Sequence, residues 1–568
     1  DPACGCGNFL VIAYRELRKL ELEVLRELHR SGQQALDIAT IIQVDVDQFH
    51  GIEIEEFPVQ IAQVALWLTD HQMNALVSEE FGQYFIRLPL KKSAHIVHSN
   101  ALRLDWNSVI AAEECDVVMG NPPFIGKKEQ NLSQKSDTAA IFHDTKNAGL
   151  LDYVACWYRK ATDFIAAHPA IRVAFVSTNS ITQGEQVGVL WPDLLRRGVH
   201  IHFAHRTFQW SSEASGKAAV HCVIIGFGLQ EAAQKTIFEY ENIQGEPHAV
   251  SAKSINPYLV DATNILIEKR TKPISGAPEI SKGSEATDFG HLILSKEEKD
   301  DLLCAEPSAK NWLRRIIGGE ELINDVERWC LWLTNISPQE LRQLPLIMLK
   351  VEQVRLARLD SHKTRTKEWA AYPTLFSEIR QPSVDYLGIP KVSSEKRIYL
   401  PISFISKDWI ASGSILTIQA ASLYHFGILS SLMHNAWMRA VCGRLESRYQ
   451  YSASIVYNNF PWPEPTDTQR KTIETAAQAV LDARVQFPTS TLADLYDPLA
   501  MPPELVRAHQ TLDRAVDAAY GKKSFASEAE RVAFLFERYQ AITSLLPAAT
   551  ARKPGKKTAK QPGHNPLP

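Results

Sequence analysis

The segment Cys115–Phe124 carries the residues best suited to chemistry. It reads Cys-Asp-Val-Val-Met-Gly-Asn-Pro-Pro-Phe, so an apolar, strand-like stretch leads into Asn121, Pro122, Pro123 and Phe124. Two consecutive prolines fix the backbone and remove two N–H donors, which leaves nearby carbonyl groups free to accept hydrogen bonds. The Asn121 side-chain carbonyl and a fixed backbone carbonyl can accept both hydrogens of an exocyclic amine, and the Phe124 ring can stack on the base that carries it. A proline turn after a strand is the structural alternative for this tetrapeptide taken alone.

Three earlier segments carry groups that could hold a nucleotide-like cofactor. Gly5 and Gly7 lie in the opening Asp-Pro-Ala-Cys-Gly-Cys-Gly and form a glycine-rich turn before an amphipathic stretch. Glu53 ends the short alternation of residues 49–54, at the place where a second-strand carboxylate binds ribose hydroxyl groups. Asn100 follows a third strand-like segment and could hydrogen-bond the edge of an adenine ring. Each would singly be an ordinary loop or strand end, and their order before the proline pair favours a functional role.

Alternating strands and helices must position these side chains. We expect helices over residues 10–30 and 57–74, because apolar residues recur there every three or four positions. Strands are expected at 49–54, just before 98–105, at 117–119 and at 172–177, with polar residues at the carboxyl ends, where open α/β sheets place their sites. The fold class is therefore α/β, with a Rossmann-like core over residues 1–228.

The amino end carries a further expectation. In a doubly wound sheet, a glycine-rich turn follows the first strand, which ends in an acid. Asp1 would be that acid. We therefore expect the first strand to be missing and the chain to be truncated at its amino end, with further domains upstream in a longer parent.

Four of these segments resemble motifs of the amino-methylating DNA methyltransferases. Residues 1–7, 51–54, 100–102 and 121–124 are similar to motifs I, II, III and IV of that group. Three later segments, 210–227, 392–397 and 451–463, are similar to the MmeI-like family of single-chain restriction–modification enzymes. The likeness covers nearly the whole chain, residues 1–545, and is much more specific than a shared fold.

The resemblance implies S-adenosylmethionine as the cofactor and N6 of adenine in double-stranded DNA as the methyl acceptor. On that pattern, the cofactor would be bordered at its methionine end by Asp1, Ala3, Gly5 and Gly7, at its ribose by Glu53, and at its adenine by Ile54 and Asn100. Asn121 and the Pro122 carbonyl would orient the target amine for direct in-line transfer, by positioning and electrostatics. Cytosine-C5 methylation would instead need a Cys nucleophile, usually in a Pro-Cys pair, and the sequence has no Pro-Cys.

Aromatic residues are needed to hold a base outside the duplex. A base inside a duplex must leave the stack before its amine can react. Phe124 would stack on one face of the extruded base, and Phe208 or Trp210 on the other, because both precede the apolar strand 220–225. The structural alternative for Phe208 and Trp210 is a place in the hydrophobic core.

Target recognition is expected after the catalytic core. Residues 229–299 are interpreted as closing strands and a linker, 300–465 as an α+β target recognition domain, 466–545 as a small helical domain and 546–568 as a disordered basic tail. The segment 300–465 interleaves arginines with aromatic residues, which suits phosphate contacts and a few base contacts. An ordinary solvated surface has a similar composition. The family resemblance places a nuclease domain upstream in the full-length parent.

Composition limits the class of protein. Of the 568 residues, 45% are hydrophobic and 22% charged, values typical of globular chains. With 61 basic and 65 acidic residues, the net charge of −4 argues against non-specific coating of polyanions but allows a local basic cleft. The eight cysteines form no CxxC pair or zinc spacing, so no metal is expected, and no apolar run is long enough to span a bilayer. We therefore expect a cytoplasmic monomer that binds double-stranded DNA and no membrane.

Two other functions remain open on the sequence. Loss of the first strand could leave a catalytically incompetent remnant that still binds its DNA sequence. The Asn-Pro-Pro-Phe motif also serves other amines, so cytosine N4 or a glutamine amide could be the acceptor. The recognition-like region after residue 300 favours DNA over protein as the substrate.

Overall fold

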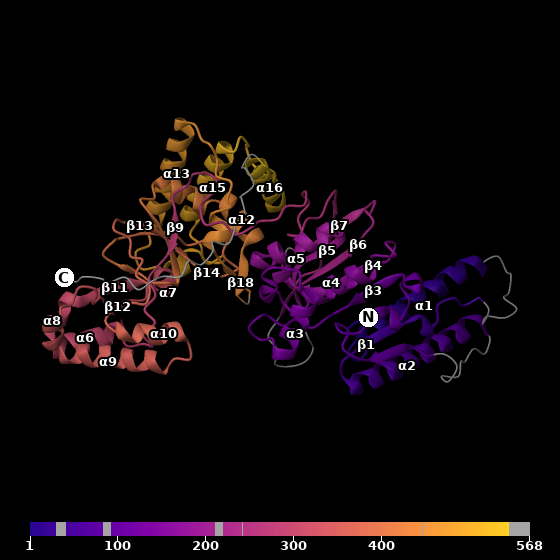
Figure 1. The fold of residues 1–568 in the computed structure, drawn as a ribbon. Coiled ribbons are helices and arrows are strands. Elements are labelled where there is room, and N and C mark those ends of the chain that lie inside the picture. The colour runs from indigo at the N-terminus through magenta and orange to yellow at the C-terminus, as the bar shows by residue number, and fades with distance from the viewer. Residues whose placement is uncertain (30–40, 83–92, 211–219, 241, 446, 545–568) are drawn as a thin grey trace.

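The chain folds into a succession of mixed helix and sheet units. The computed structural model describes residues 1–568 except 30–40, 83–92, 211–219, 241, 446 and 545–568. Figure 1 shows an amino-terminal part with α1 and α2, a central sheet, and a larger carboxyl-terminal half. Among the helices so described, none has the length and apolarity needed to cross a bilayer.

The amino-terminal part combines a small parallel sheet with two long helices. Its strands are β1 (His50–Glu53) and β2 (His95–His98), and its helices are α1 (Asn8–His29) and α2 (Glu56–Phe81). One hydrophobic cluster joins Tyr14 of α1, Leu66 of α2 and Ile96 of β2. Both helices therefore pack on this sheet, but only part of the apolar stripe of α1 is buried, because Leu17 and Leu20 are exposed.

A six-stranded sheet forms the centre of the molecule. Its order is β3-β4-β6-β5-β7-β8, with β3 (Val117–Gly120), β4 (Arg172–Thr178), β5 (His200–Trp210), β6 (Val220–Gly228), β7 (Lys235–Glu239) and β8 (His248–Ala252). The helices α3 (Leu132–Ile141), α4 (Ala155–Phe164) and α5 (Gly184–Arg196) connect its first strands. β3 runs parallel to β4, and β6 runs antiparallel to both β4 and β5. The carboxyl ends of β3, β4 and β5 therefore lie along one edge.

The carboxyl-terminal half contains three small sheets. The first has the order β10 (Ile293–Ser295), β12 (Arg328–Leu331), β11 (Leu313–Ile317), β16 (Ile410–Ala411). The second has the order β15 (Ser403–Ile405), β13 (Tyr386–Pro390), β17 (Ile415–Gln419), β9 (Ile280–Lys282). The third has the order β14 (Val392–Ser393), β19 (Arg448–Gln450), β18 (Gly443–Leu445). The helices between them are α6 (Lys296–Ala305), α7 (Gly319–Asn324), α8 (Pro338–Arg342), α9 (Pro345–Asp360), α10 (Thr364–Glu368), α11 (Leu423–Ser430) and α12 (Leu432–Val441). Strand β9 comes from the segment interpreted as a linker and pairs with β17.

A buried arginine holds part of this half together. Arg358 of α9 has no solvent exposure. Its guanidinium donates five hydrogen bonds of 2.8–3.0 Å, to the backbone carbonyls of Ala286, Thr287, Trp369, Tyr372 and Leu375. All five N–H groups of the guanidinium are thus satisfied by two separate stretches of chain.

The last described part of the chain is helical. They are α13 (Asp467–Val485), α14 (Leu492–Leu495), α15 (Pro503–Ala519) and α16 (Glu528–Ser544). The three long ones lie in the segment 466–545, which the sequence indicates as helical. The Thr466 side chain caps α13 by accepting from the Gln469 backbone N–H. The tail expected to be disordered lies outside the described residues.

Candidate active site

The carboxyl end of β3 places Asn121 at the edge shared by β3, β4 and β5. The Asn121 side-chain Oδ1 is buried and has no hydrogen-bond partner among the described residues. Pro122 is buried, Pro123 is exposed, and Phe124 is half-buried against the main hydrophobic cluster. A buried carbonyl oxygen without a donor costs about 1–3 kcal/mol, so this atom is suited to receive a hydrogen from a ligand.

The chain after Phe124 is hydrogen-bonded to the residues just before α4. The Ile125 N–H donates to Asp152 Oδ1 at 3.1 Å, and the Tyr153 N–H donates to the Ile125 carbonyl at 3.0 Å. Gln130 also donates to that carbonyl, at 3.2 Å. Burial raises the pKa of the Asp152 carboxyl. These contacts hold the Asn-Pro-Pro-Phe loop in one position without using Asn121.

Asp1 lies between β1 and β3, beside the Asn-Pro-Pro-Phe loop. The Asp1 backbone nitrogen donates to the His50 carbonyl at 2.8 Å, and the Ile52 N–H donates to the Asp1 carbonyl at 2.9 Å. Its carboxylate Oδ1 accepts from the Ala3 N–H at 3.0 Å. A Cβ added to Gly120 would lie 2.4 Å from that same oxygen, so a side chain at position 120 would displace the Asp1 carboxylate. The segments resembling motifs I and IV therefore meet at this point.

The glycine-rich turn is joined to the end of β1. The Gly5 N–H donates to Glu53 Oε2 at 2.9 Å, and the Glu55 N–H donates to Glu53 Oε1 at 3.1 Å. Gly7 has a φ of +84°, and a Cβ there would lie 3.0 Å from Ala62 Cβ on α2. Positive φ and this close approach explain glycine at position 7. The turn and the acidic strand end thus form one hydrogen-bonded unit.

Ile54 is exposed, whereas the Asn100 side chain already makes hydrogen bonds within the protein. The Ile54 side chain is 56% exposed, so its apolar surface is open to an aromatic ring. The Asn100 amide is already engaged, because Oδ1 accepts from the Leu102 N–H at 2.9 Å and Nδ2 donates to Asp137 Oδ2 at 3.2 Å. A contact between Asn100 and an adenine would have to use the second lone pair of Oδ1 or exchange one of these bonds.

Asp137 of α3 connects segments of the candidate site, and sequence reasoning missed it. It is buried, and besides Asn100 it accepts from Arg103 Nε at 2.7 Å and from the Tyr153 hydroxyl at 2.8 Å. It therefore links the segment resembling motif III to the start of α4. The only signal in the sequence is an acid within a short helix, which is not specific.

The two aromatic residues expected to clamp a base lie on β5. The Phe208 ring stacks on Tyr240, with centroids 5.4 Å apart and planes at 21°. Trp210 ends β5 and pairs with Val220, but its side chain lies outside the described residues. Because β4 and β6 separate β5 from β3, the strands carrying Phe208 and Asn121 are about 14 Å apart. Their stacking role therefore remains a prediction.

The side chains at the strand end of β1 are suited to an adenosine-type cofactor. Burial raises the pKa of the Cys4 thiol to about 11, so it stays protonated. Across the described part of the chain, no three His, Cys, Asp or Glu side chains come together as metal ligands. The Glu53 carboxylate instead stands at a strand end beside an open glycine turn, since a Cβ at Gly5 would meet nothing within 4 Å. Such a carboxylate suits ribose hydroxyl groups.

Comparison with known proteins gives matches along almost the entire chain. The family model of the MmeI DNA-methyltransferase domain matches residues 1–239, that of the MmeI target recognition domain residues 261–464, and that of the MmeI C-terminal domain residues 465–547. The recognition match includes β9, which lies in the segment interpreted as a linker.

Two relatives extend this result. A structure of the type IIL restriction-modification enzyme MmeI in complex with DNA is 56% identical, with a TM-score of 0.88, over 96% of this chain and 73% of that one. DNA methyltransferase A of Bacillus subtilis (strain 168) is 39% identical over 547 residues, which are 96% of this chain and 61% of that protein. The chain thus spans less than two thirds of the length of the curated relative. On its three matched domains and its likeness to MmeI, this chain belongs to the MmeI family.

Proposed function

We propose that the chain is an S-adenosylmethionine-dependent DNA methyltransferase that modifies N6 of adenine in double-stranded DNA. The observation that carries this proposal is the buried, unpartnered Oδ1 of Asn121 at the carboxyl end of β3. Family membership supports the reaction class, since the first 239 residues match a DNA-methyltransferase domain.

The cofactor would lie across the strand ends of β1 and β3. S-adenosylmethionine supplies an electrophilic methyl group when bound. Asp1, Ala3, Gly5 and Gly7 would border its methionine end, Glu53 would accept from its ribose hydroxyl groups, and Ile54 would pack on its adenine with Asn100 at the ring edge. The contact of Asp1 with Gly120 supports this placement, because it puts the cofactor turn beside Asn121.

The target amine would be held by Asn121 and Pro122. An aromatic exocyclic amine is a poor nucleophile, since its lone pair is delocalised into the ring. Accepting both of its hydrogens at fixed carbonyl oxygens favours a pyramidal nitrogen, whose lone pair then points out of the ring plane. The hydrogen bond from the Ile125 N–H to Asp152 supports this role, because it fixes the loop before the base arrives. Phe124 would stack on the extruded base, with Phe208 or Trp210 on its other face.

The carboxyl-terminal half would read the DNA sequence. A target recognition domain matches residues 261–464, and the 56% identical relative is seen in complex with DNA. We place the boundaries of catalytic core, linker, recognition domain and helical domain at 228, 299, 465 and 545, and we assign a single copy as the working unit. Any nuclease of the restriction–modification system would belong to a longer parent.

Modification-sensitive sequencing of DNA from a methylation-deficient bacterial host that expresses the chain tests the proposal. We expect one short motif carrying a single modified adenine, and nucleoside analysis of the same DNA should show N6-methyladenine. Asn121→Ala should abolish the signal, whereas Asn242→Ala, at an exposed asparagine between the matched methyltransferase and recognition domains, should retain it. A modified cytosine would overturn the substrate and keep the fold. Specific DNA binding with no modification and no cofactor binding would instead identify a non-catalytic remnant.

A further inference from the structure

Three buried side-chain atoms along one edge of the six-stranded sheet have no hydrogen-bond partner in the described part of the chain. They are Oδ1 of Asn121, Nδ2 of Asn179 and Nε2 of His221. Asn121 directly follows β3, Asn179 directly follows β4, and His221 lies at the start of β6, next to the pair of Thr178 and Cys222. Because β4 is parallel to β3 and antiparallel to β6, these three strand ends meet at one edge.

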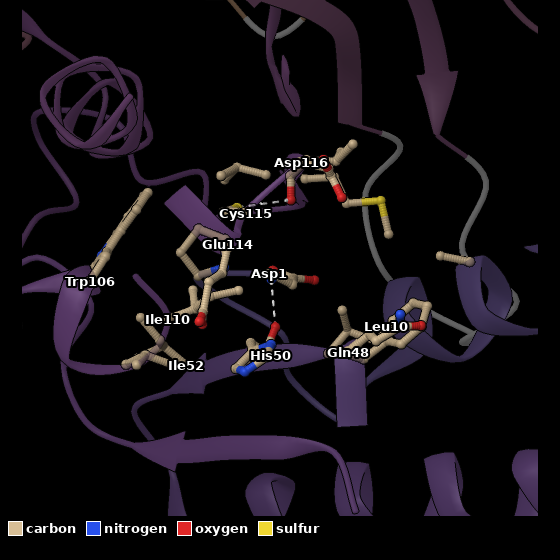
Figure 2. Close-up of a pocket in the computed structure, with 18 of the residues that line it drawn as sticks. Asp1, Leu10, Gln48, His50, Ile52, Trp106, Ile110, Glu114, Cys115 and Asp116 are labelled. Atoms are coloured by element: carbon tan, nitrogen blue, oxygen red, sulfur yellow. Dashed lines mark hydrogen bonds between the residues drawn. The ribbon is translucent and has the colours of Figure 1, made fainter. Parts of the chain in front are cut away.

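The apolar cavity between β1 and β3 does not account for these atoms. Figure 2 shows this cavity, with Asp1 at its centre and hydrogen-bonded to His50. Its volume is about 640 Å³, and its lining includes none of Asn121, Asn179 and His221. The unpartnered atoms therefore lie outside it, at the edge where the Asn-Pro-Pro-Phe loop begins.

The backbone around Asn179 is held in place, whereas its side-chain amide N–H₂ has no acceptor among the described residues. Asn179 is 4% exposed and begins a 3₁₀ turn, Asn179–Thr182. The Thr182 hydroxyl donates to the Asn179 carbonyl at 2.9 Å, and Trp191 Nε1 of α5 donates to the Ile181 carbonyl at 2.8 Å. A buried donor without an acceptor is destabilising, so an acceptor atom on a ligand would be bound favourably here.

The turn that carries Asn179 and the Asn-Pro-Pro-Phe loop are connected through Asp152. Its Oδ1 accepts from the Ile125 N–H at 3.1 Å, and its own N–H donates to Gln186 Oε1 at 2.9 Å. Gln186 lies in the first turn of α5, which begins two residues after the 3₁₀ turn ends. Both segments are therefore held by the same anchor.

The spacing of Asn121 and Asn179 suits a base edge between them. In the ladder of β3 and β4, Gly120 pairs with Phe175, so Asn179 lies three residues farther along the strand direction than Asn121. Neighbouring strands are about 4.8 Å apart and rise about 3.3 Å per residue, which gives a Cα–Cα separation of about 11 Å. Each hydrogen bond takes up about 3 Å, so this separation leaves room for a flat ring that is bonded to both amides.

We propose that Asn179 reads the target base, by donating from Nδ2 to N1 of adenine while Asn121 accepts from N6. This inference rests on the proposed function and adds a specificity-determining residue to it. An acceptor beside a donor is complementary to an amine beside a bare ring nitrogen, which is the pattern at the Watson–Crick edge of adenine. Guanine and thymine have an oxo group beside a ring N–H, so they would set acceptor against acceptor and donor against donor. Cytosine shares the pattern of adenine, so the Asn179 amide excludes oxo bases rather than choosing between the two amino bases.

Asn179 is better suited than His221 to be this donor. Burial and the nearby Arg444 lower the pKa of His221, so its imidazole is neutral at pH 7. A neutral imidazole carries a hydrogen on Nε2 in only one of its two tautomers, whereas an asparagine amide always carries two.

Duplexes that differ in one ring atom of the target base test this contact in the full chain. They carry the motif found by sequencing, with adenine, 1-deazaadenine or 7-deazaadenine at the target position, so that N1 or N7 is replaced by C–H. The kcat/KM for methyl transfer is measured for the parent chain, for Asn179→Leu and for the control Ser180→Ala, which changes the next residue of the same turn. The ratio for adenine over 1-deazaadenine should be at least about fivefold larger in the parent chain and in Ser180→Ala than in Asn179→Leu. The ratio for adenine over 7-deazaadenine should be the same in all three.

Each ratio is taken within one protein, so it does not depend on how much of a variant folds. Equal 1-deazaadenine ratios in the parent chain and in Asn179→Leu would overturn the proposal. So would a change confined to the 7-deazaadenine ratio, or a change in the 1-deazaadenine ratio that His221→Phe produces and Asn179→Leu does not. A parent chain that leaves the adenine duplex unmethylated would refute the proposed function itself, whereas methylated adenine with equal ratios would refute only the role of Asn179.

Discussion

Glu53 gives the most quantitative test of the proposed cofactor site. Its two carboxylate oxygens accept from the Gly5 and Glu55 N–H groups at 2.9 and 3.1 Å, and we propose that they also accept from two ribose hydroxyl groups. A hydrogen bond to a charged group contributes at least about 1.5 kcal/mol. Loss of both ribose contacts in Glu53→Ala therefore removes about 3 kcal/mol, which is about a 100-fold rise in the Kd for S-adenosylmethionine.

The conservative variant separates the contact from the fold. Glu53→Gln keeps one acceptor oxygen, so its Kd should rise about tenfold. Glu56→Ala removes the same charge from an exposed position three residues away and should leave the Kd within about twofold of the parent chain. Isothermal titration calorimetry gives all four values, and fluorescence anisotropy checks that affinity for DNA is unchanged. A Kd for Glu53→Ala equal to that of the parent chain would refute the assignment of Glu53 to the ribose.

The other predictions concern the Asn-Pro-Pro-Phe loop, the glycine-rich turn and a buried histidine. Asn121→Ala should lower the methylation rate at least about 100-fold while DNA affinity stays the same. Single-turnover kinetics measure this rate, and a rate equal to that of the parent chain would show that Asn121 takes no part in catalysis. Gly7→Ala should lower the Tm more than Gly5→Ala, because both have positive φ but only position 7 brings the new Cβ within 3.0 Å of Ala62; thermal unfolding with the opposite order would contradict this. Burial lowers the pKa of His434 to about 3, so the unfolded chain takes up a proton below pH 6.5 that the folded chain does not. Stability due to this neutral histidine is present above pH 6.5 and is lost towards pH 3; between pH 7 and pH 5 the loss is about 2 kcal/mol, and urea unfolding of His434→Gln should show a smaller loss.

The elements around the site could be predicted because their signals are local. A short apolar alternation predicted β1, and a buried apolar run followed by two prolines predicted β3 and its loop. Apolar residues at three- or four-residue steps predicted α1 and α2. These patterns depend on neighbours within one turn or one strand. The position of Asn121 at a strand end follows from them directly.

The contacts that connect distant segments could not be predicted in the same way. Asp137 gathers Asn100, Arg103 and Tyr153, yet nothing in a ten-residue helix marks one acid as buried. β9 has three residues, too few for an alternation, and its partner β17 lies more than a hundred residues later. The stack of Phe208 on Tyr240 depends on the placement of β5 beside β7. Each of these depends on tertiary packing rather than on local pattern.

The five carbonyls around Arg358 have a consequence for how the recognition region folds and evolves. The guanidinium is charged at any physiological pH and meets only neutral acceptors in an interior without water exposure. If only some of these hydrogen bonds formed, the buried charge of Arg358 would be left partly unsolvated. Residues 286–287, α9 and 369–375 should therefore form and melt as one cooperative unit. Substitutions on α9 that preserve the fold are then confined to its outward side, because the inward side holds the buried charge of Arg358.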